Sequence, residues 1–136
     1  MKYAIELYYD KETEKKLFDL ARSHKVMPAY INSVGMFNDT KTIFVSPTMN
    51  SDMYQFQREL HECLKDFDTN GWEWYVPNRW VPHCTIALTG EDESEAFFKA
   101  SDLLLRNFEK MCGEFAAIGL VKITFPVEEI FTIELS

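Results

Sequence analysis

Short segments in which apolar and polar residues alternate predict strands along much of the chain. The alternation has the period of two that places successive side chains on opposite faces of a sheet. The predicted strands cover residues 2–9, 30–37, 42–46, 80–88, 115–123 and 129–135. Turn residues separate two neighbouring pairs, with Asn38-Asp39 in the first pair and Phe125-Pro126 in the second. Each pair is therefore predicted to form a hairpin.

Apolar residues at helical spacing predict helices between these strands. The first covers residues 11–23, with Asp10 as its N-cap, because an aspartate side chain accepts from the first N–H groups of a helix. The second begins at Asn50 or Ser51 and ends near residue 67. The third begins at Asp92 or Ser94 and ends near residue 111, and Gly113 follows its end as a helix-terminating glycine.

The segment at residues 80–88, Trp-Val-Pro-His-Cys-Thr-Ile-Ala-Leu, is predicted to be a buried strand that carries candidate chemistry. Pro82 belongs at its first residue, because proline cannot donate to a sheet ladder. One predicted face places an imidazole beside a hydroxyl and consists of His83, Thr85 and Ala87. The other face is apolar, is expected to pack on a core, and consists of Cys84, Ile86 and Leu88.

Length and charge narrow the class of protein. A chain of 136 residues is expected to form one domain, residues 1–136, with a real core. The net charge of −8 argues against binding long duplex nucleic acid through phosphate contacts. A small phosphate ester in a local pocket remains compatible with this charge.

The cysteines and the apolar runs indicate a cytoplasmic protein. Cys63, Cys84 and Cys112 are an odd number without metal-like spacing, so they are interpreted as small buried residues in a reducing cytosol. No apolar run is long enough to span a membrane. The N-terminus lacks the pattern of a signal peptide.

The two predicted hairpins resemble each other, which suggests an internal repeat. Residues 30–36 and 115–121 share an aromatic residue followed by an aliphatic-Gly-aliphatic step, and each hairpin continues with Ile-Phe in its second strand. A helix, a strand and a helix precede the second hairpin, whereas one helix precedes the first. If the halves are related, the first half lacks a strand and a helix.

Several of these segments together resemble the two-histidine phosphoesterase superfamily, which includes 2′-5′ RNA ligase-like proteins and RNA cyclic phosphodiesterases. The resemblance rests on the strand at residues 80–88, Leu60-His61, Ile118-Gly119-Leu120 and the opening Tyr3-Ala-Ile-Glu-Leu7. It implies a bilobal α+β fold of mostly antiparallel sheets with outer helices, in which each lobe supplies a His-x-Thr/Ser strand. His83 and Thr85 match the second motif. The expected place of the first motif holds only His24-Lys25-Val26, without a hydroxyl, so the first lobe is shortened.

The resemblance implies hydrolysis of a 2′,3′-cyclic phosphate, on RNA ends or small nucleotides, without a metal or other cofactor. Histidine suits proton transfer near neutral pH, so His83 would act as general acid or base. The Thr85 hydroxyl would donate to a phosphoryl oxygen. Trp80 and Tyr75 either stack on a base or pack locally, Arg79 either meets a phosphate or is solvated, and Tyr8 faces either a cleft or the surface.

Three functions remain open on the sequence. The first is a phosphodiesterase whose second His-x-Thr comes from a segment absent from the printed chain or from another subunit. The second is a non-catalytic relative that binds a nucleotide or another phosphate ester. The third is a soluble α+β domain in which His83 is structural, as His61 is expected to be on its helix flank. A shortened lobe would also expose an apolar sheet edge that a homodimer would cover.

Overall fold

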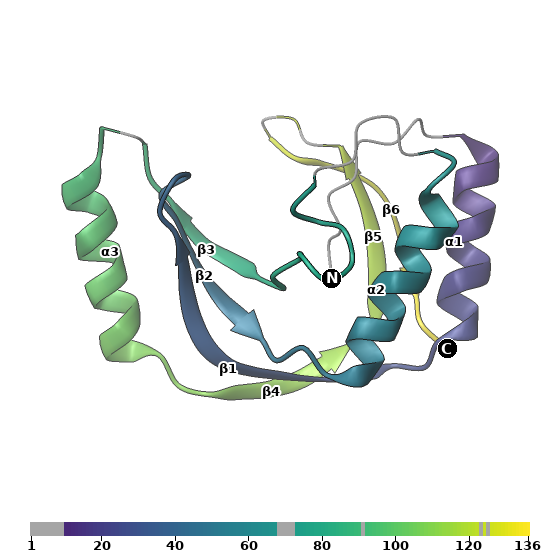
Figure 1. The fold of residues 1–136 in the computed structure, drawn as a ribbon, viewed down its shortest axis with the longest axis horizontal. Helices are drawn as coiled ribbons and strands as arrows, with labels where there is room; N and C mark the ends of the chain where they lie inside the picture. Colours follow the sequence, from purple (N-terminus) through teal and green to yellow (C-terminus); the bar gives the residue numbers. More distant parts are fainter. Residues whose placement is uncertain (1–9, 68–72, 91, 123, 125) are drawn as a thin grey trace. The chain divides into compact units, whose positions relative to one another are not determined.

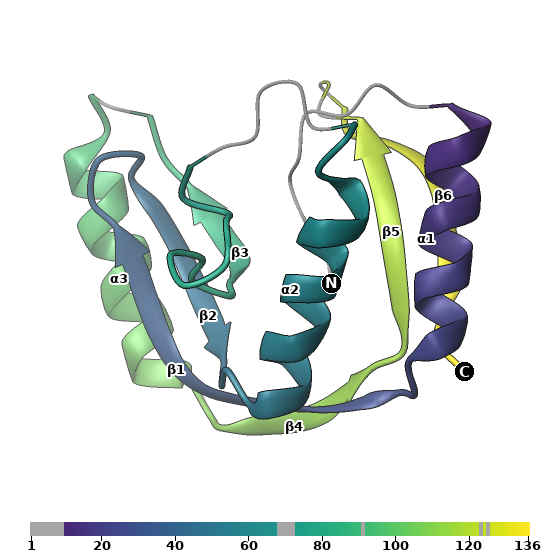
Figure 2. The same cartoon turned by 45° about the vertical axis from the view of Figure 1, so that its right-hand side comes forward.

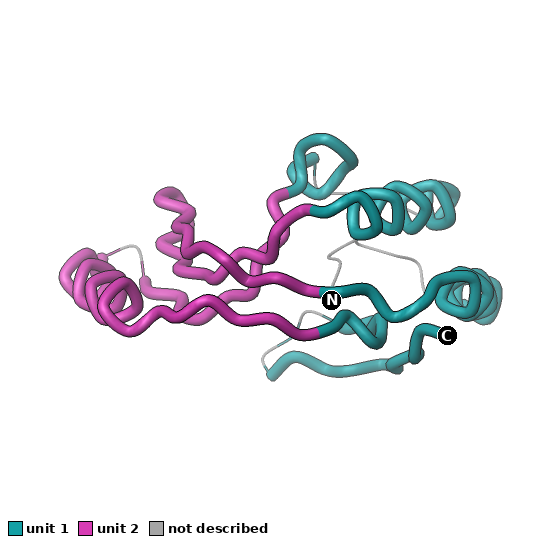
Figure 3. The backbone as a smooth tube through the Cα atoms, turned by 90° about the horizontal axis from the view of Figure 1, so that it is seen from below, with its two compact units in different colours: residues 1–28, 50–80, 114–136 teal, residues 29–49, 81–113 magenta. Residues whose placement is uncertain are grey.

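The computed structural model describes residues 10–67, 73–90, 92–122, 124 and 126–136. The chain divides into two compact units (Figure 3), and each is described by itself. Unit 1 comprises residues 1–28, 50–80 and 114–136, and unit 2 comprises residues 29–49 and 81–113. The predicted strand at residues 2–9 lies outside the described residues.

The two helices of unit 1 begin at capping residues. Helix α1 is Lys11–Ser23, and Asp10 Oδ1 accepts from the backbone N of Glu12 at 3.0 Å and of Thr13 at 2.8 Å. Helix α2 is Ser51–Leu64, and Asn50 Oδ1 accepts from the backbone N of Met53 at 2.9 Å. Both predicted starts are confirmed, while α2 ends before the predicted residue 67.

A hairpin of β5 (Ala117–Lys122) and β6 (Glu128–Glu134) completes unit 1. The strands are antiparallel, with Ile118 opposite Ile133, which confirms the second predicted hairpin. Phe125, one of the two residues predicted to form its turn, lies outside the described residues. Helices α1 and α2 lie beside this hairpin (Figure 1), and their apolar faces meet it in one core. The buried members of that core are Leu17, Ala21, Met27, Phe56, Leu60, Leu64, Ile118, Ile133 and Leu135.

A four-stranded sheet, most of which belongs to unit 2, has the order β3-β2-β1-β4. Its strands are β1 (Met27–Phe37), β2 (Thr42–Pro47), β3 (Cys84–Leu88) and β4 (Met111–Phe115). The first predicted hairpin, β1–β2, is confirmed. Helix α3 (Ser94–Asn107) lies along one face of the sheet (Figure 2). Ser101 Oγ lies 3.6 Å from Met36 Sδ, and Met36 is opposite Ile43, so α3 covers the face that carries Met36 and Ile43.

The expectation of a third helix extending to residue 111 is wrong. Helix α3 ends at Asn107, and Phe108 already has the extended dihedral angles φ −70° and ψ 125°. Residues 111–115 form strand β4, so Gly113 lies within a strand instead of ending a helix. Pairing of β4 with β1 outweighs the helical spacing of Phe108 and Met111, because strand pairing depends on tertiary context.

The predicted α+β class with antiparallel sheets is confirmed. Among the described residues, no helix has both the length and the apolar character that crossing a membrane requires.

Candidate functional site

His83 lies immediately before β3 and is held by the backbone of its own segment. Its Nδ1 lies 2.6 Å from the carbonyl oxygen of Val81. A carbonyl oxygen only accepts, so Nδ1 carries the hydrogen and Nε2 is the nitrogen with the lone pair in the neutral ring. Ser46 Oγ donates to the Pro82 carbonyl at 2.8 Å, which ties the residue before His83 to β2.

Two phenylalanine rings support the imidazole of His83. The ring of Phe37 meets it edge to face, with 5.0 Å between centroids, and the ring of Phe44 lies 5.4 Å away. Phe37 and Phe44 also contact each other, with 4.5 Å between centroids. His83 is half-buried by this arrangement, so its ring orientation is set by packing as well as by the Val81 hydrogen bond.

Thr85 lies on the same sheet face as the His83 ring. Thr85 is opposite Phe44 on β2, and residues opposite each other in a ladder share a face. This face is the one that α3 does not cover, because Phe44 and its neighbour Ile43 point to opposite sides of the sheet. Thr85 is exposed. The structure therefore brings an imidazole and a hydroxyl together on one accessible face of unit 2.

The expectation that Ala87 shares this face is wrong. Ala87 is opposite Ile43, whereas Thr85 is opposite Phe44, so Ile86 is an extra residue without a partner on β2. This one-residue bulge reverses the alternation after Thr85. Ala87 therefore lies on the face that α3 covers.

The prediction that this strand is buried is also wrong. Ile86 is 58% exposed and Leu88 is 65% exposed, and Cys84 is exposed as well. Among the described residues β3 is an edge strand with β2 as its neighbour, so its apolar side chains lack the cover that a central strand would have. Cys112, which was also expected to be buried, is exposed on β4, whereas Cys63 is partly buried and the pKa of its thiol is raised by that burial.

The other predicted site residues that the structure describes belong to unit 1. Tyr75 is half-buried, which raises the pKa of its hydroxyl, and its carbonyl accepts from Gln57 Nε2 at 2.9 Å. The backbone N–H of Trp80 donates to the Val76 carbonyl at 3.1 Å, and the Trp80 side chain is half-buried. Arg79 is engaged by its neighbours rather than simply solvated, since its Nη1 lies 3.2 Å from Glu73 Oε2. Tyr8 lies outside the described residues.

The two remaining histidines of the chain lie in unit 1. His24 ends α1, and its Nε2 donates to Glu59 Oε2 at 2.7 Å while the ring meets Phe56 edge to face at 4.9 Å. His61 is a half-buried residue of α2, as its helical spacing predicted. His24 therefore has a structural partner, and no hydroxyl residue stands two positions after it.

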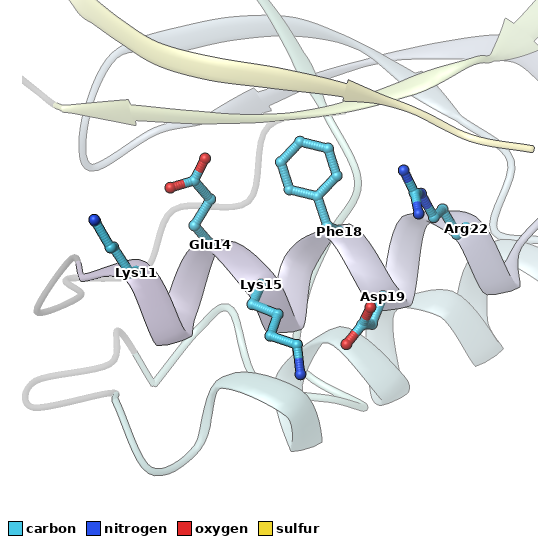
Figure 4. Close-up of a pocket in the computed structure, with 6 residues that line it drawn as sticks. All are labelled: Lys11, Glu14, Lys15, Phe18, Asp19 and Arg22. Carbon is cyan, nitrogen blue, oxygen red and sulfur yellow. The ribbon is translucent and has the colours of Figure 1, made fainter.

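A shallow groove runs along α1 in unit 1 (Figure 4). Phe18 points toward the β5–β6 hairpin, where its ring lies 6.4 Å from that of Phe131. The remaining lining side chains are Lys11, Glu14, Lys15, Asp19 and Arg22. Acidic and basic groups intermix along this groove, so it lacks the concentration of positive charge that a phosphate site needs. In the described ranges, no three His, Cys, Asp or Glu side chains come together as a metal site.

Comparison with known families assigns the chain. The family described as the 2′-5′ RNA ligase superfamily matches residues 3–124, which is most of the chain and includes both His83 and Thr85. A comparison with curated proteins found no match. The match confirms the resemblance that the sequence suggested, and the chain belongs to the 2′-5′ RNA ligase superfamily of two-histidine phosphoesterases.

Proposed function

We propose that this protein is a cyclic phosphodiesterase that opens 2′,3′-cyclic phosphates on RNA ends or small nucleotides. The observation that carries the proposal is the setting of His83. Its Nδ1 donates to the Val81 carbonyl, two phenylalanine rings fix its plane, and Thr85 lies on the same accessible face. Family membership supplies the substrate class, an RNA or nucleotide phosphate ester.

The fixed tautomer suits proton transfer at Nε2. When the ring is neutral, the Nε2 lone pair takes a proton from a water molecule as its oxygen attacks phosphorus. When the ring is charged, Nε2–H gives a proton to the departing ribose oxygen as the P–O bond breaks. The hydrogen bond from Nδ1 to Val81 persists in both states, so the ring need not reorient between them.

Thr85 would stabilise the negative charge that develops on the phosphoryl oxygens. Its hydroxyl can donate to a non-bridging phosphoryl oxygen, and its position two residues after His83 on one face would let both groups contact one phosphate. Because Thr85 is exposed, it reaches a ligand without a change in the sheet.

A complete acid–base pair needs a second proton carrier. The printed sequence holds one His-x-Thr, at residues 83–85, and its other histidines are His24 and His61. We therefore propose that the second His-x-Thr comes from a segment outside the printed chain or from a second copy of the protein. A missing acid or base costs about 10²–10⁴-fold in rate, so the chain by itself would turn over slowly.

The test measures hydrolysis of adenosine 2′,3′-cyclic phosphate by the full chain, with product followed by ³¹P NMR. His83→Ala and Thr85→Val should each lower kcat, by at least about 10²-fold, while Thr85→Ser keeps the hydroxyl and most of the activity. His61→Gln, on α2 of the other unit, is the matched histidine control and should retain wild-type turnover. Unchanged turnover in His83→Ala would refute the proposal.

A second candidate is a nucleotide-binding protein without turnover. The single His-x-Thr of the printed sequence favours it. In this case, adding the protein to adenosine 2′,3′-cyclic phosphate would shift the ³¹P NMR signal of the ligand, and no product would form. Thr85→Val and His83→Ala would then weaken binding, whereas Thr85→Ser would not.

A further inference from the structure

The loop at residues 73–80 of unit 1 presents an aromatic ring to solvent. Trp74 is 63% exposed, although tryptophan is among the side chains that gain most from burial. The guanidinium carbon of Arg79 lies 4.7 Å from the centroid of the Trp74 ring, within the range of a cation–π contact. Arg79 Nη1 also pairs with Glu73 Oε2 at 3.2 Å, which fixes the guanidinium over the indole.

Helix α2 holds this loop by two side chains. Gln57, which is 1% exposed, donates from Nε2 to the Tyr75 carbonyl at 2.9 Å, next to Trp74. The Tyr54 hydroxyl donates to Asn78 Oδ1 at 2.6 Å, next to Arg79. The loop therefore has one anchor beside the indole and one beside the guanidinium.

The backbone of the loop turns at one of these anchors. Asn78 has φ 71°, in the left-handed region, which asparagine tolerates better than most residues other than glycine. The backbone N–H groups of Arg79 and Trp80 both donate to the Val76 carbonyl at 3.1 Å, which closes the turn around Asn78.

We propose that Trp74, backed by Arg79, is a stacking platform for a nucleobase. The guanidinium of Arg79 contacts the indole of Trp74. Because Trp74 is largely exposed, a second planar group can also contact the indole. A nucleobase fits this setting because aromatic side chains stack on bases of any sequence, and arginine adds a cation–π contribution. The proposal rests on the proposed function, which supplies a nucleotide as the ligand.

The surroundings of Trp74 favour a base over an apolar protein surface. Its described neighbours in the loop include the charged residues Glu73 and Arg79 and the polar residue Asn78. A hydrophobic docking site would instead surround the indole with apolar side chains.

The test distinguishes the contribution of the base to binding from the contribution of the phosphate. The dissociation constant of the full-length His83→Ala variant, which cannot consume the ligand, is measured by calorimetry for adenosine 2′,3′-cyclic phosphate and for methyl riboside 2′,3′-cyclic phosphate, which lacks the base. Adding Trp74→Ala should raise the dissociation constant of the nucleotide about 5- to 150-fold, the equivalent of about 1–3 kcal/mol, and leave that of the base-free ester unchanged. Trp74→Phe should keep most of the affinity. Phe98→Ala removes an aromatic ring that is 69% exposed on α3 of unit 2 and is the matched control.

Two results would overturn the platform. One is an unchanged dissociation constant for the nucleotide in the Trp74→Ala variant. The other is an equal loss for the nucleotide and the base-free ester, which would mean that the substitution disturbs binding of the phosphate. Neither result depends on turnover, so a chain that binds the nucleotide through Trp74 without hydrolysing it would refute the proposed activity and support the platform.

Discussion

A Cβ atom added to Gly35 would lie 2.4 Å from Cε2 and Cζ of Phe44. The two residues are opposite each other on β1 and β2, and the absent side chain of Gly35 leaves the space that the Phe44 ring fills. The ring of Phe44 in turn lies 5.4 Å from that of His83. Gly35 on β1 therefore determines where the Phe44 ring lies, and that ring supports the imidazole of His83 immediately before β3.

Gly35→Ala should displace the Phe44 ring and loosen the support of His83. Overpacking of this kind costs about 1–3 kcal/mol of unfolding free energy, which urea denaturation measures. Turnover, or nucleotide affinity if there is no turnover, should fall as well. Gly113→Ala is the control, because nothing lies within 4 Å of a Cβ at Gly113. If Gly35→Ala matched Gly113→Ala in stability, the close approach would be refuted.

Asn50 has two separable roles at the start of α2. Its Oδ1 accepts from the Met53 N–H, and its Nδ2 donates to the Pro28 carbonyl at 3.1 Å. Asn50→Ala removes both and should lower the unfolding free energy by about 0.5–2 kcal/mol. Asn50→Asp keeps the cap and loses the donor, so thermal denaturation should place it between the wild type and Asn50→Ala. A stability of Asn50→Asp below that of Asn50→Ala would contradict the capping role.

The side chain of Gln57 should contribute more to the free energy of unfolding than that of Gln55, an exposed residue on the same helix. Gln57→Leu leaves the Tyr75 carbonyl without this buried donor, which should cost about 1–3 kcal/mol. Gln55→Leu removes only an exposed hydrogen bond to Glu59 one turn away and should stay within about 0.5 kcal/mol of the wild type. Chemical denaturation of the two variants makes the comparison, and equal stabilities would show that Gln57 does not hold the loop.

Glu59 gives unit 1 a pH-dependent contribution to stability. Hydrogen bonds from Gln55 and from His24 hold the pKa of the Glu59 carboxyl below its usual value of 4.5. Because the folded pKa is the lower one, this contribution is present above pH 4.5 and is lost as the pH falls through the folded pKa. The difference in unfolding free energy between the wild type and Glu59→Gln should therefore shrink between about pH 5 and pH 3.

The Gln55 donor can be tested directly on the Glu59 carboxyl. Carbon-detected NMR titration should give a pKa below 4.5 in the wild type and a higher one in Gln55→Ala. A wild-type value at or above 4.5 would contradict the geometry of the pair.

The sequence identified the features whose causes are local. Asp10 and Asn50 mark the starts of α1 and α2 because their side chains bond to N–H groups two or three residues further along the chain. The alternation of residues 115–123 and 129–135 predicted the second hairpin, because the two strands are neighbours in the sequence and are separated only by a short turn. Family membership was also visible in the sequence, because the His-x-Thr strand and its neighbours are contiguous motifs.

Tertiary structure decided what depends on a partner in another segment. The bulge at Ile86 exists only in the register with β2, and it moved Ala87 away from the face of His83. The exposure of Ile86 and Leu88 depends on which elements cover β3, and strand β4 depends on pairing with β1. The contact of Arg79 with the Trp74 ring likewise could not be predicted from the sequence, because it depends on how the loop folds. Residue periodicity states which side chains share a face, but only the folded chain determines what lies against that face.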